Sequence, residues 1–368
     1  MQHGGTRYVY DFDSPPPLPA SALTQLLGGK GAGLVVMATE LRLPVPPGFT
    51  ITTRACTEYL DGRWPQGLDE ELREHMARLA QRAGRRFGDP ADPLLVSVRS
   101  GAPVSMPGMM DTILNLGLSE ATAAGLAAAS GGDGFAADCL RRLRQSYRDL
   151  IAAERLPDDP WLQLRSAIEA VFRSWNSERA RAYRRHEGIP DDLGTAVTVQ
   201  AMVFGNRGAD SGTGVVFTRN AATGERTLYG DVMFNAQGED VVAGRHAPQP
   251  LSVLDERLPD VAAELRRHAE LLERHHADLC EIEFTVERGR LWLLQVRVGK
   301  RSPRAALRMA IDMAEDDTFP CSREEAVRRV ARQLADPPRV FARAADAPAP
   351  IATGLPASPG LATGAIVT

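Results

Sequence analysis

Acidic, amide and basic side chains that could act together lie at alternate positions in one stretch, residues 281–301, EIEFTVERGRLWLLQVRVGKR. This stretch predicts a β-hairpin, because two runs of alternating apolar and polar residues flank the short segment Arg288-Gly289-Arg290. One face of the hairpin would carry Glu281, Glu283, Gln295 and Arg297. Such a face is either a solvated surface with cross-strand ion pairs or part of a functional site, and other segments of the chain must decide between the two.

The pairing of the two runs can be predicted from their apolar residues. These are Ile282, Phe284 and Val286 in the first run and Trp292, Leu294 and Val296 in the second. Because side chains alternate between the two faces of a strand, only a connection with an odd number of residues places both sets on one side. We therefore predict a three-residue connection, which sets the four polar residues opposite one another.

A second candidate is Lys30, which lies in the glycine-rich segment LLGGKGAGL. The chain has 43 lysines and arginines, of which only Lys30 and Lys300 are lysine, so Lys30 is not a default surface cation. A glycine loop that leads into a helix presents free backbone N–H groups and the positive end of a helix dipole, which suits a phosphate. The spacing is not that of a Walker A motif, and a tight turn with an exposed lysine remains the alternative interpretation.

A third candidate is Arg99, at the end of the apolar strand predicted at residues 94–101. The strand leads into a loop of small residues that ends near Met110. Functional groups often lie where a buried strand delivers a charge into a loop, although an ion pair with a surface carboxylate would explain Arg99 equally well. We interpret Met106, Met109 and Met110 as packing residues.

The composition is that of a globular protein, and it excludes several classes. The chain has 368 residues, a net charge of −4, and 43% hydrophobic and 24% charged residues. There is no basic excess for nucleic acid, no apolar run for a membrane and no signal-peptide pattern. The four cysteines are far apart and are interpreted as buried small hydrophobic residues, which predicts a reduced, cytoplasmic setting.

Periodicity predicts an α/β front part, a helical block and a β-rich part. Helices are expected at 32–41, 68–87, 119–185, 258–278, 302–313 and 321–334, and strands at 49–52, 94–101, 196–204, 215–219 and 226–229. The helical block at 119–185 shows no residues with an evident chemical role. Residues 342–351 are interpreted as a linker.

Seven segments together resemble one family, the nucleotide-binding domain of pyruvate, phosphate dikinase. In chain order they are LLGGKGAGL, LPVPPGFTITT, LVSVRSGAPVSMPGMMDTILNLGL, RSWNSERARAYRR, AVTVQAMVFGNRGADSGTGVVFTRN, NAQGEDVVAG and EIEFTVERGRLWLLQVRVGKR. Each motif is weak alone, but seven in the family's order are specific. The resemblance extends from about Leu26 to Val367.

The resemblance implies an α+β fold of the ATP-grasp type, with two lobes and a helical insert. In this family Lys30 and Arg99 would contact the ATP phosphates, and the loop that begins at Gly101 would cover them. The adenine side of the site would be lined by Gln200, Met202 and Val203.

The same resemblance implies a role for the hairpin. Glu281, Glu283 and Gln295 would bind Mg²⁺ beside the phosphates, and Arg297 would bind the transferring phosphate. The residues with an implied catalytic role are Arg99, Glu283, Gln295 and Arg297. The nucleotide would be bound by Lys30, Arg99, Gly101, Gln200, Met202, Val203, Glu281 and Arg297.

This sequence departs from the family pattern in three places. Glu281 stands where the family usually has aspartate, which puts the metal geometry there in question. The family's QTRNGKR reads QVRVGKR here, and no segment with the family's phosphate-accepting histidine or its pyruvate-binding barrel is present.

We therefore expect five parts: an N-terminal lobe at 1–118, a helical insert at 119–190, a β-rich lobe at 191–300, a helical linker at 301–345, and the start of a swivelling phosphohistidine domain at 346–368. The expected function is the Mg·ATP-binding, phosphoryl-donating part of a pyruvate, phosphate dikinase. Its partner would be a phosphohistidine domain, in trans or in a missing C-terminal part, and a homodimer is a further expectation. The alternatives are a related dikinase with another acceptor, such as phosphoenolpyruvate synthase or an antibiotic phosphotransferase, and a non-catalytic nucleotide-binding module.

Overall fold

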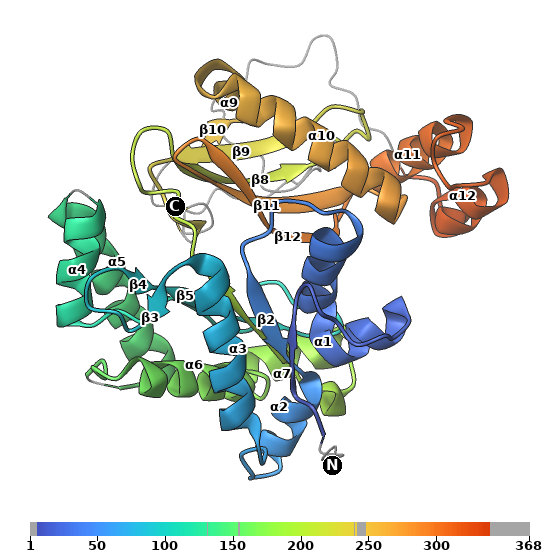
Figure 1. Ribbon diagram of the computed structural model, residues 1–368. Helices are drawn as coiled ribbons and strands as arrows, with labels where there is room; N and C mark the ends of the chain where they lie inside the picture. The colour runs from blue at the N-terminus through green and yellow to red at the C-terminus, as the bar shows by residue number, and fades with distance from the viewer. Residues whose placement is uncertain (1–5, 131, 154, 239, 241–247, 339–368) are drawn as a thin grey trace, which may run out of the picture. The chain divides into compact units, whose positions relative to one another are not determined.

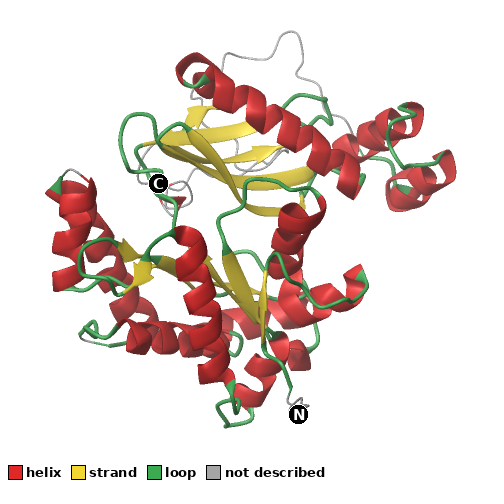
Figure 2. Cartoon of the chain, in the orientation of Figure 1, coloured by secondary structure: helices red, strands yellow, loops and turns green. Residues whose placement is uncertain are grey.

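The computed structural model describes residues 6–130, 132–153, 155–238, 240 and 248–338 (Figure 1). The linker expected at 342–351 and the partial domain expected at 346–368 lie outside these residues. Runs of strands and runs of helices follow one another along the chain, and the first five-stranded sheet is antiparallel, so the expected α+β class is confirmed (Figure 2).

The bounds of the elements are as follows. The helices are α1 Ala20–Val35, α2 Thr53–Leu60, α3 Leu68–Ala83, α4 Glu120–Ser130, α5 Asp133–Ser146, α6 Pro160–Ser174, α7 Glu178–Glu187, α9 Ser252–Arg257, α10 Pro259–His276, α11 Pro303–Glu315, α12 Arg323–Arg329 and α13 Ala331–Ala335. The strands are β1 Val9–Asp11, β2 Gly48–Ile51, β3 Arg86–Phe87, β4 Pro93–Leu94, β5 Val96–Gly101, β6 Thr112–Leu116, β7 Ala196–Ala201, β8 Gly212–Phe217, β9 Tyr229–Phe234, β10 Gln249–Pro250, β11 Cys280–Glu287 and β12 Arg290–Val298.

The chain divides into two compact units. The first comprises residues 1–215, 231–265 and 282–297, and the second comprises 216–230, 266–281 and 298–368. All residues that line the pocket described below belong to the first unit.

The first unit contains an antiparallel sheet with the strand order β1-β2-β7-β5-β6. All six residues of the central strand β7 are buried. Because successive side chains of a strand point to opposite faces, burial at every position means that both faces of β7 are covered. Helix α6 packs against β5, β6 and β7, and α1 packs against β2, β5 and β7. The sheet therefore holds the ends of β5 and β7 in a rigid, dry setting.

A second five-stranded sheet has the order β10-β9-β8-β11-β12. The sequence placed the strand after β8 at residues 226–229, which is wrong, because β9 begins at Tyr229 and continues to Phe234. The helix expected at 321–334 is two helices separated at Val330. Ser322 caps the first of these through its side chain, as the sequence predicted.

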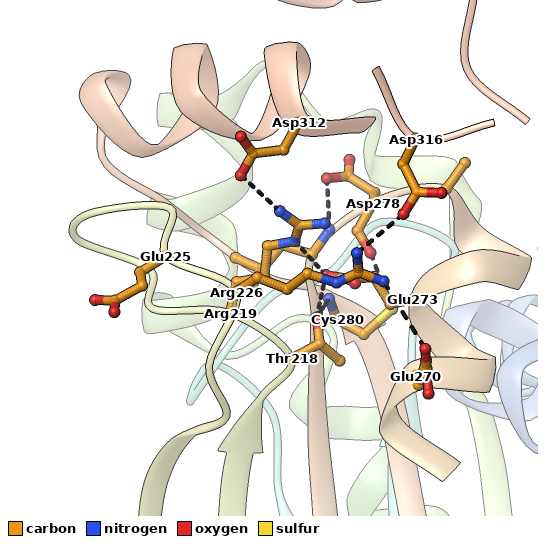
Figure 3. Close-up of polar contacts among 12 residues, drawn as sticks. Thr218, Arg219, Glu225, Arg226, Glu270, Glu273, Asp278, Cys280, Asp312 and Asp316 are labelled. Carbon is orange, nitrogen blue, oxygen red and sulfur yellow. Dashed lines mark hydrogen bonds and ion pairs between the residues drawn. The ribbon is translucent and has the colours of Figure 1, made fainter. Parts of the chain in front are cut away.

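The charged centre of the second unit is Arg219, whose side chain is 1% exposed. Its guanidinium donates to Glu273 Oε1 at 2.6 Å and to Asp312 Oδ2 at 3.1 Å (Figure 3). The hydroxyl of Thr218 donates to the same Glu273 oxygen at 3.1 Å. These bonds join the end of β8 to α10 and α11, so a buried charge is neutralised where three elements meet.

Candidate functional site

A pocket of about 260 Å³ lies in the first unit, at the ends of β5 and β7 and beside β8, β11 and β12. Six of the residues predicted from the sequence line it: Lys30, Arg99, Gln200, Met202, Val203 and Glu283. These residues lie up to 253 positions apart in the chain (30 to 283). The fold therefore brings together residues that the sequence analysis had connected only through the family resemblance.

Arg99 is held rigidly at the pocket wall. It is 8% exposed, and its Nη2 donates to Gln200 Oε1 at 2.8 Å and to the backbone oxygen of Leu294 at 2.9 Å. The Glu283 carboxylate lies 3.5 Å from Arg99 Nη1. Burial lowers the pKa of Arg99 and Glu283 opposes that effect. Arg99 is therefore fixed by pocket residues, and the alternative of a surface ion pair is wrong.

Gln200 connects β7 to the segment before β2. Its side-chain oxygen accepts from Arg99, while its Nε2 donates to the backbone oxygen of Pro46 at 3.0 Å. Both ends of this buried amide are used by the protein. The side chain therefore holds Arg99 in position, and Gln200, Met202 and Val203 all line the pocket.

Lys30 is half-buried in the pocket wall and lies in helix α1, which makes the alternative of an exposed lysine in a turn wrong. Its pKa falls to about 7, first because burial penalises the charged ammonium and then because Arg99 and Arg297 repel it, while Glu283 partly compensates. Three cations face one carboxylate in this group. Such an excess of positive charge in a poorly solvated setting favours an anionic ligand.

The glycine loop expected around Lys30 is wrong, because Lys30 lies in helix α1, which is kinked at Gly28, and the glycines before it pack against the segment after β5. Gly28 has φ +70°, and a Cβ there would lie 1.7 Å from the backbone oxygen of Gly101. The amide of Gly29 donates to the backbone oxygen of Ala102 at 2.9 Å. That N–H is therefore used within the protein, and the glycines allow close packing of α1 against the segment after β5.

The predicted hairpin is present, but its three-residue connection is wrong. Strand β11 ends at Glu287 and β12 begins at Arg290, so the turn has two residues, Arg288 and Gly289. Their φ angles are +50° and +72°, as a two-residue turn of type I′ requires.

The shorter turn changes which residues of β12 face the core. Leu291 and Leu293 are buried, whereas Trp292 and Leu294 are only half-buried. Val296 is buried as predicted, so the alternation changes parity between Leu293 and Val296. Gln295 and Arg297, on either side of Val296, are half-buried.

Four of the predicted site residues do not line the pocket: Gly101, Glu281, Gln295 and Arg297, all within the described part of the chain. Gly101 packs on Lys30, because a Cβ there would meet Lys30 Cβ at 3.2 Å. Arg297 is close enough for its charge to lower the pKa of Lys30. Glu281 lies two residues before Glu283 on β11, so the pleat points both to one face.

The structure adds pocket residues that received no role from the sequence. They are Ser97, Thr112, Leu114, Ala201, Thr213, Gly214, Val215, Gln237, Gly238, Thr285 and Leu294. Gln237 and Gly238 belong to the segment NAQGEDVVAG, which the sequence analysis used only as a family marker.

The helical block, too, has a role that its sequence did not indicate. Arg142 of α5 binds the carboxylate of Asp240 through two hydrogen bonds of 2.8 and 2.9 Å. Asp240 in turn accepts from the backbone N–H of Gln237 at 2.9 Å. Helix α5 therefore holds the segment that forms one wall of the pocket. The contact between Arg142 and Asp240 joins residues 98 positions apart, so no local sequence pattern indicated this role of α5.

An α+β protein with a buried pocket, rich in cations at one end and walled by apolar strand residues, has the features of a protein that binds a phosphorylated ligand with an apolar or aromatic part. The family model "Pyruvate phosphate dikinase, AMP/ATP-binding domain" matches residues 24–63 and 60–263. The chain belongs to this family.

Relatives with the printed name "Pyruvate, phosphate dikinase" are similar along nearly the whole chain. The protein of Rhizobium meliloti (strain 1021) is 43% identical over 424 aligned residues, which cover 98% of this chain and 47% of the relative. That of Clostridium symbiosum is 41% identical over 412 residues, covering 98% and 46%. "Pyruvate, phosphate dikinase 1, chloroplastic" of Oryza sativa subsp. japonica is 43% identical, covering 98% and 43%. The chain thus spans about half the length of the curated relatives it matches.

Within the part of the chain that the structure describes, no helix combines the length and apolar character needed to cross a lipid bilayer.

Proposed function

We propose that this chain is the Mg·ATP-binding, phosphoryl-donating part of a pyruvate, phosphate dikinase and that its fold is of the ATP-grasp type. The observation that carries the proposal is the meeting of Lys30, Arg99 and Glu283 at one pocket beside the apolar ends of β7 and β8. A nucleoside triphosphate offers matching chemistry, because its phosphates need cations and its base needs an apolar wall.

The cations would act on the phosphates. Arg99 is held by Gln200 and Leu294, so its free N–H groups are oriented before the ligand arrives. Lys30 would take up a proton as the phosphates enter, and Arg297 would hold the transferring group. Rigid, poorly solvated cations stabilise charge that develops during transfer without reorganising at that moment.

The donor set fits a Mg²⁺ ion that arrives with ATP. Glu283 presents a carboxylate to the pocket, and Gln295 and Glu281 are the further oxygen donors proposed. In the described residues, no group of three His, Cys, Asp or Glu side chains is placed to hold a metal. Mg²⁺ is commonly held by one or two carboxylates together with phosphate oxygens and water, so ATP itself would complete the site. The ion would neutralise phosphate charge.

Met202 and Val203 would face the adenine, with the backbone of β7 reading its edge. The strand is buried at every position, so its end is a fixed platform. The loop from Gly101 to Met110 would cover the phosphates. In this loop Met106 is buried in a cluster with Trp175, which anchors one point of the cover.

The chain's share of the reaction would end at the donated phosphoryl group. A phosphohistidine domain, in trans or in a longer form of the protein, would accept it, and the isolated chain would not convert pyruvate. We retain the five-part division at residues 118, 190, 300 and 345 as a proposal, together with a homodimer and a cytoplasmic setting.

The first experiment is titration calorimetry of the purified chain with Mg·ATP. We expect binding by the wild type, and weakening of about tenfold or more for Arg99→Met and Glu283→Gln, since each loses a charged contact. Glu256→Gln is the matched control, because Glu256 is exposed and lies outside the pocket. Absence of binding by the wild type, or equal binding by all four proteins, would contradict the proposal.

A second experiment separates donation from mere binding. The chain is incubated with Mg·ATP and an added phosphohistidine domain, and label transfer to the histidine is followed. A donor loses transfer in Arg297→Met and Glu283→Gln. A non-catalytic nucleotide-binding module gives no transfer with the wild type, and a related dikinase gives transfer only to another acceptor.

A further inference from the structure

The pocket wall at Gln237 is held by a chain of hydrogen-bonded amides, of which Asn115 and Gln237 are buried and Asn206 is half-buried. Gln237 is 2% exposed and Asn115 of β6 is 0% exposed. Asn115 Nδ2 donates to Gln237 Oε1 at 3.3 Å, and Gln237 Nε2 lies 3.4 Å from Asn206 Oδ1 and 3.3 Å from Cys139 Sγ. Asn206 Nδ2 donates to the Asp138 carboxylate at 3.3 Å.

The direction of these hydrogen bonds follows from the carboxylate at one end. An ionised carboxylate only accepts, so Asn206 must point its NH₂ group to Asp138 and its oxygen to Gln237. Gln237 must then donate to Asn206 and accept at Oε1, which leaves Asn115 as the donor to that oxygen. Each amide orientation is therefore set by its neighbour, and Asn115 is required as a hydrogen-bond donor.

The backbone at Asn115 is unusual in a way that serves this contact. Val96 pairs with Leu116 while Val98 pairs with Ile113, so β6 contains one extra residue opposite β5. Asn115 lies in that bulge with φ +64°. Asparagine tolerates this conformation better than other residues with a Cβ, and a bulge re-aims a side chain.

The carboxamide of Asn115 is also energetically unfavourable in its buried position, and packing alone does not explain its presence. Its Oδ1 is buried and accepts no hydrogen bond from any described residue. An unpaired buried acceptor is unfavourable, and an apolar residue in its place would avoid that cost. Asn115 lies on the same strand as Thr112 and Leu114, both of which line the pocket.

We propose that Asn115 is a positioning residue for nucleotide binding, acting through the carboxamide of Gln237 to fix the pocket wall formed by Gln237 and Gly238. This inference rests on the proposed function, since the ligand whose affinity it governs is Mg·ATP. Asn115 does not itself line the pocket, so the effect passes through the hydrogen bond to Gln237.

The test compares Asn115→Gly and Asn115→Asp with the wild type. Glycine keeps the left-handed backbone and removes the amide, whereas aspartate keeps the shape and replaces the donor by an acceptor. Asn235→Gly is the matched control: Asn235 has φ +52°, precedes Gln237 by two residues, and is exposed. Calorimetry with Mg·ATP should show affinity about three- to tenfold weaker for both variants at position 115, and within about twofold of the wild type for the control.

A pH series supplies a readout that a merely structural role would not change. Burial favours the neutral form of an aspartic acid at position 115, and the protonated carboxyl can again donate to Gln237 Oε1. The ratio of the dissociation constants of Asn115→Asp and the wild type should therefore fall toward one between pH 8 and about pH 5.5. Denaturation by urea at each pH establishes that both proteins are folded.

The outcomes distinguish the two proposals. If the wild type does not bind Mg·ATP, the proposed function is wrong and the positioning role with it. If the wild type binds and the folded variants at position 115 bind equally well, only the role of Asn115 is wrong. If Asn115→Gly does not fold, the pH dependence of Asn115→Asp decides, and a ratio that stays constant with pH overturns the inference.

Discussion

At the scale of single residues, the pocket contains cationic side chains, Lys30 and Arg99, whose charged forms are disfavoured by burial. Lys30 is half-buried, and the charges of Arg99, Arg297 and Glu283 act on it. Without a ligand this arrangement costs free energy, because ammonium and guanidinium groups repel in a poorly solvated setting. A ligand that brings negative charge removes the cost. The site is thus prepared for an anion before one binds.

Proton uptake on binding is the first consequence at this scale. Near pH 8, Lys30 is mostly neutral in the free protein, since its pKa is about 7. Phosphate charge raises that pKa, so binding of Mg·ATP should take up about one proton. Calorimetry in buffers of different ionisation enthalpy measures the uptake. Lys30→Met should abolish it, and the same uptake in that variant would contradict the assignment.

The stability of the ligand-free protein should follow the same titration. The pKa of Lys30 is about 7 in the folded state and near its ordinary value of 10.5 when unfolded. Between these values the unfolded chain binds more protons, so the free energy of unfolding should rise with pH across this window. In Lys30→Met the rise should be smaller, as denaturation by urea at several pH values would show.

A further prediction concerns the close packing around Gly28. Gly28→Ala should lower the free energy of unfolding by about 3 kcal/mol or more, because φ is +70° and the new Cβ would lie 1.7 Å from Gly101 O. Gly289→Ala is the matched control, with φ +72° and nothing within 4 Å, and should cost only about 1 kcal/mol. Equal losses in urea denaturation would show that close packing at Gly28 is unimportant.

At the scale of elements, the length of the hairpin turn determines which residues of β12 face the core and which face the pocket. An even turn places Leu291 and Leu293 toward the core and Leu294 toward the pocket. The backbone oxygen of Leu294 then accepts from Arg99. The register of one hairpin thereby positions a cation that belongs to another sheet.

Truncation of neighbouring leucines tests this register. Leu293 is 0% exposed, so Leu293→Ala should lower the free energy of unfolding by about 3 kcal/mol. Leu294→Ala should cost about 1 kcal/mol, because its side chain is half-buried at the pocket. Its effect should appear instead in Mg·ATP affinity. A larger loss of stability for Leu294→Ala would favour the three-residue connection.

At the scale of the whole molecule, each unit has its own buried polar centre. The first has Arg99 with Gln200 and Glu283, and the second has Arg219 with Glu273 (Figure 3). The first lines the pocket. The second joins β8, α10 and α11, and its hydrogen bonds are satisfied within its own unit. We therefore assign the second a role in stability.

Removal of one partner of the second centre should be costly. Glu273→Gln leaves Asp312 as the remaining counter-charge of Arg219, 1% exposed, but weakens the hydrogen bonds that Arg219 and Thr218 donate to position 273, and should lower the free energy of unfolding by about 2 kcal/mol. Arg226→Met is the control, since Arg226 is 46% exposed and its ion pair with Asp316 should contribute less than about 1 kcal/mol. Mg·ATP affinity of the folded Glu273→Gln protein should be unchanged. A strong loss of affinity would give this centre a role in binding.

By itself the sequence determined the features that repeat along the chain or depend on near neighbours. The helical block, the strand that contains Arg99, the cap at Ser322 and the family pattern all follow from local periodicity and motif order. A strand's side chains alternate and a helix's recur at about every fourth residue whatever the rest of the chain does.

Only the tertiary structure decided the length of the hairpin turn, the lowered pKa of Lys30 and the contact of Asn115 with Gln237. The partners in that contact are 122 residues apart. Burial and hydrogen bonding between such distant residues depend on how two sheets are packed, and no local pattern contains that information.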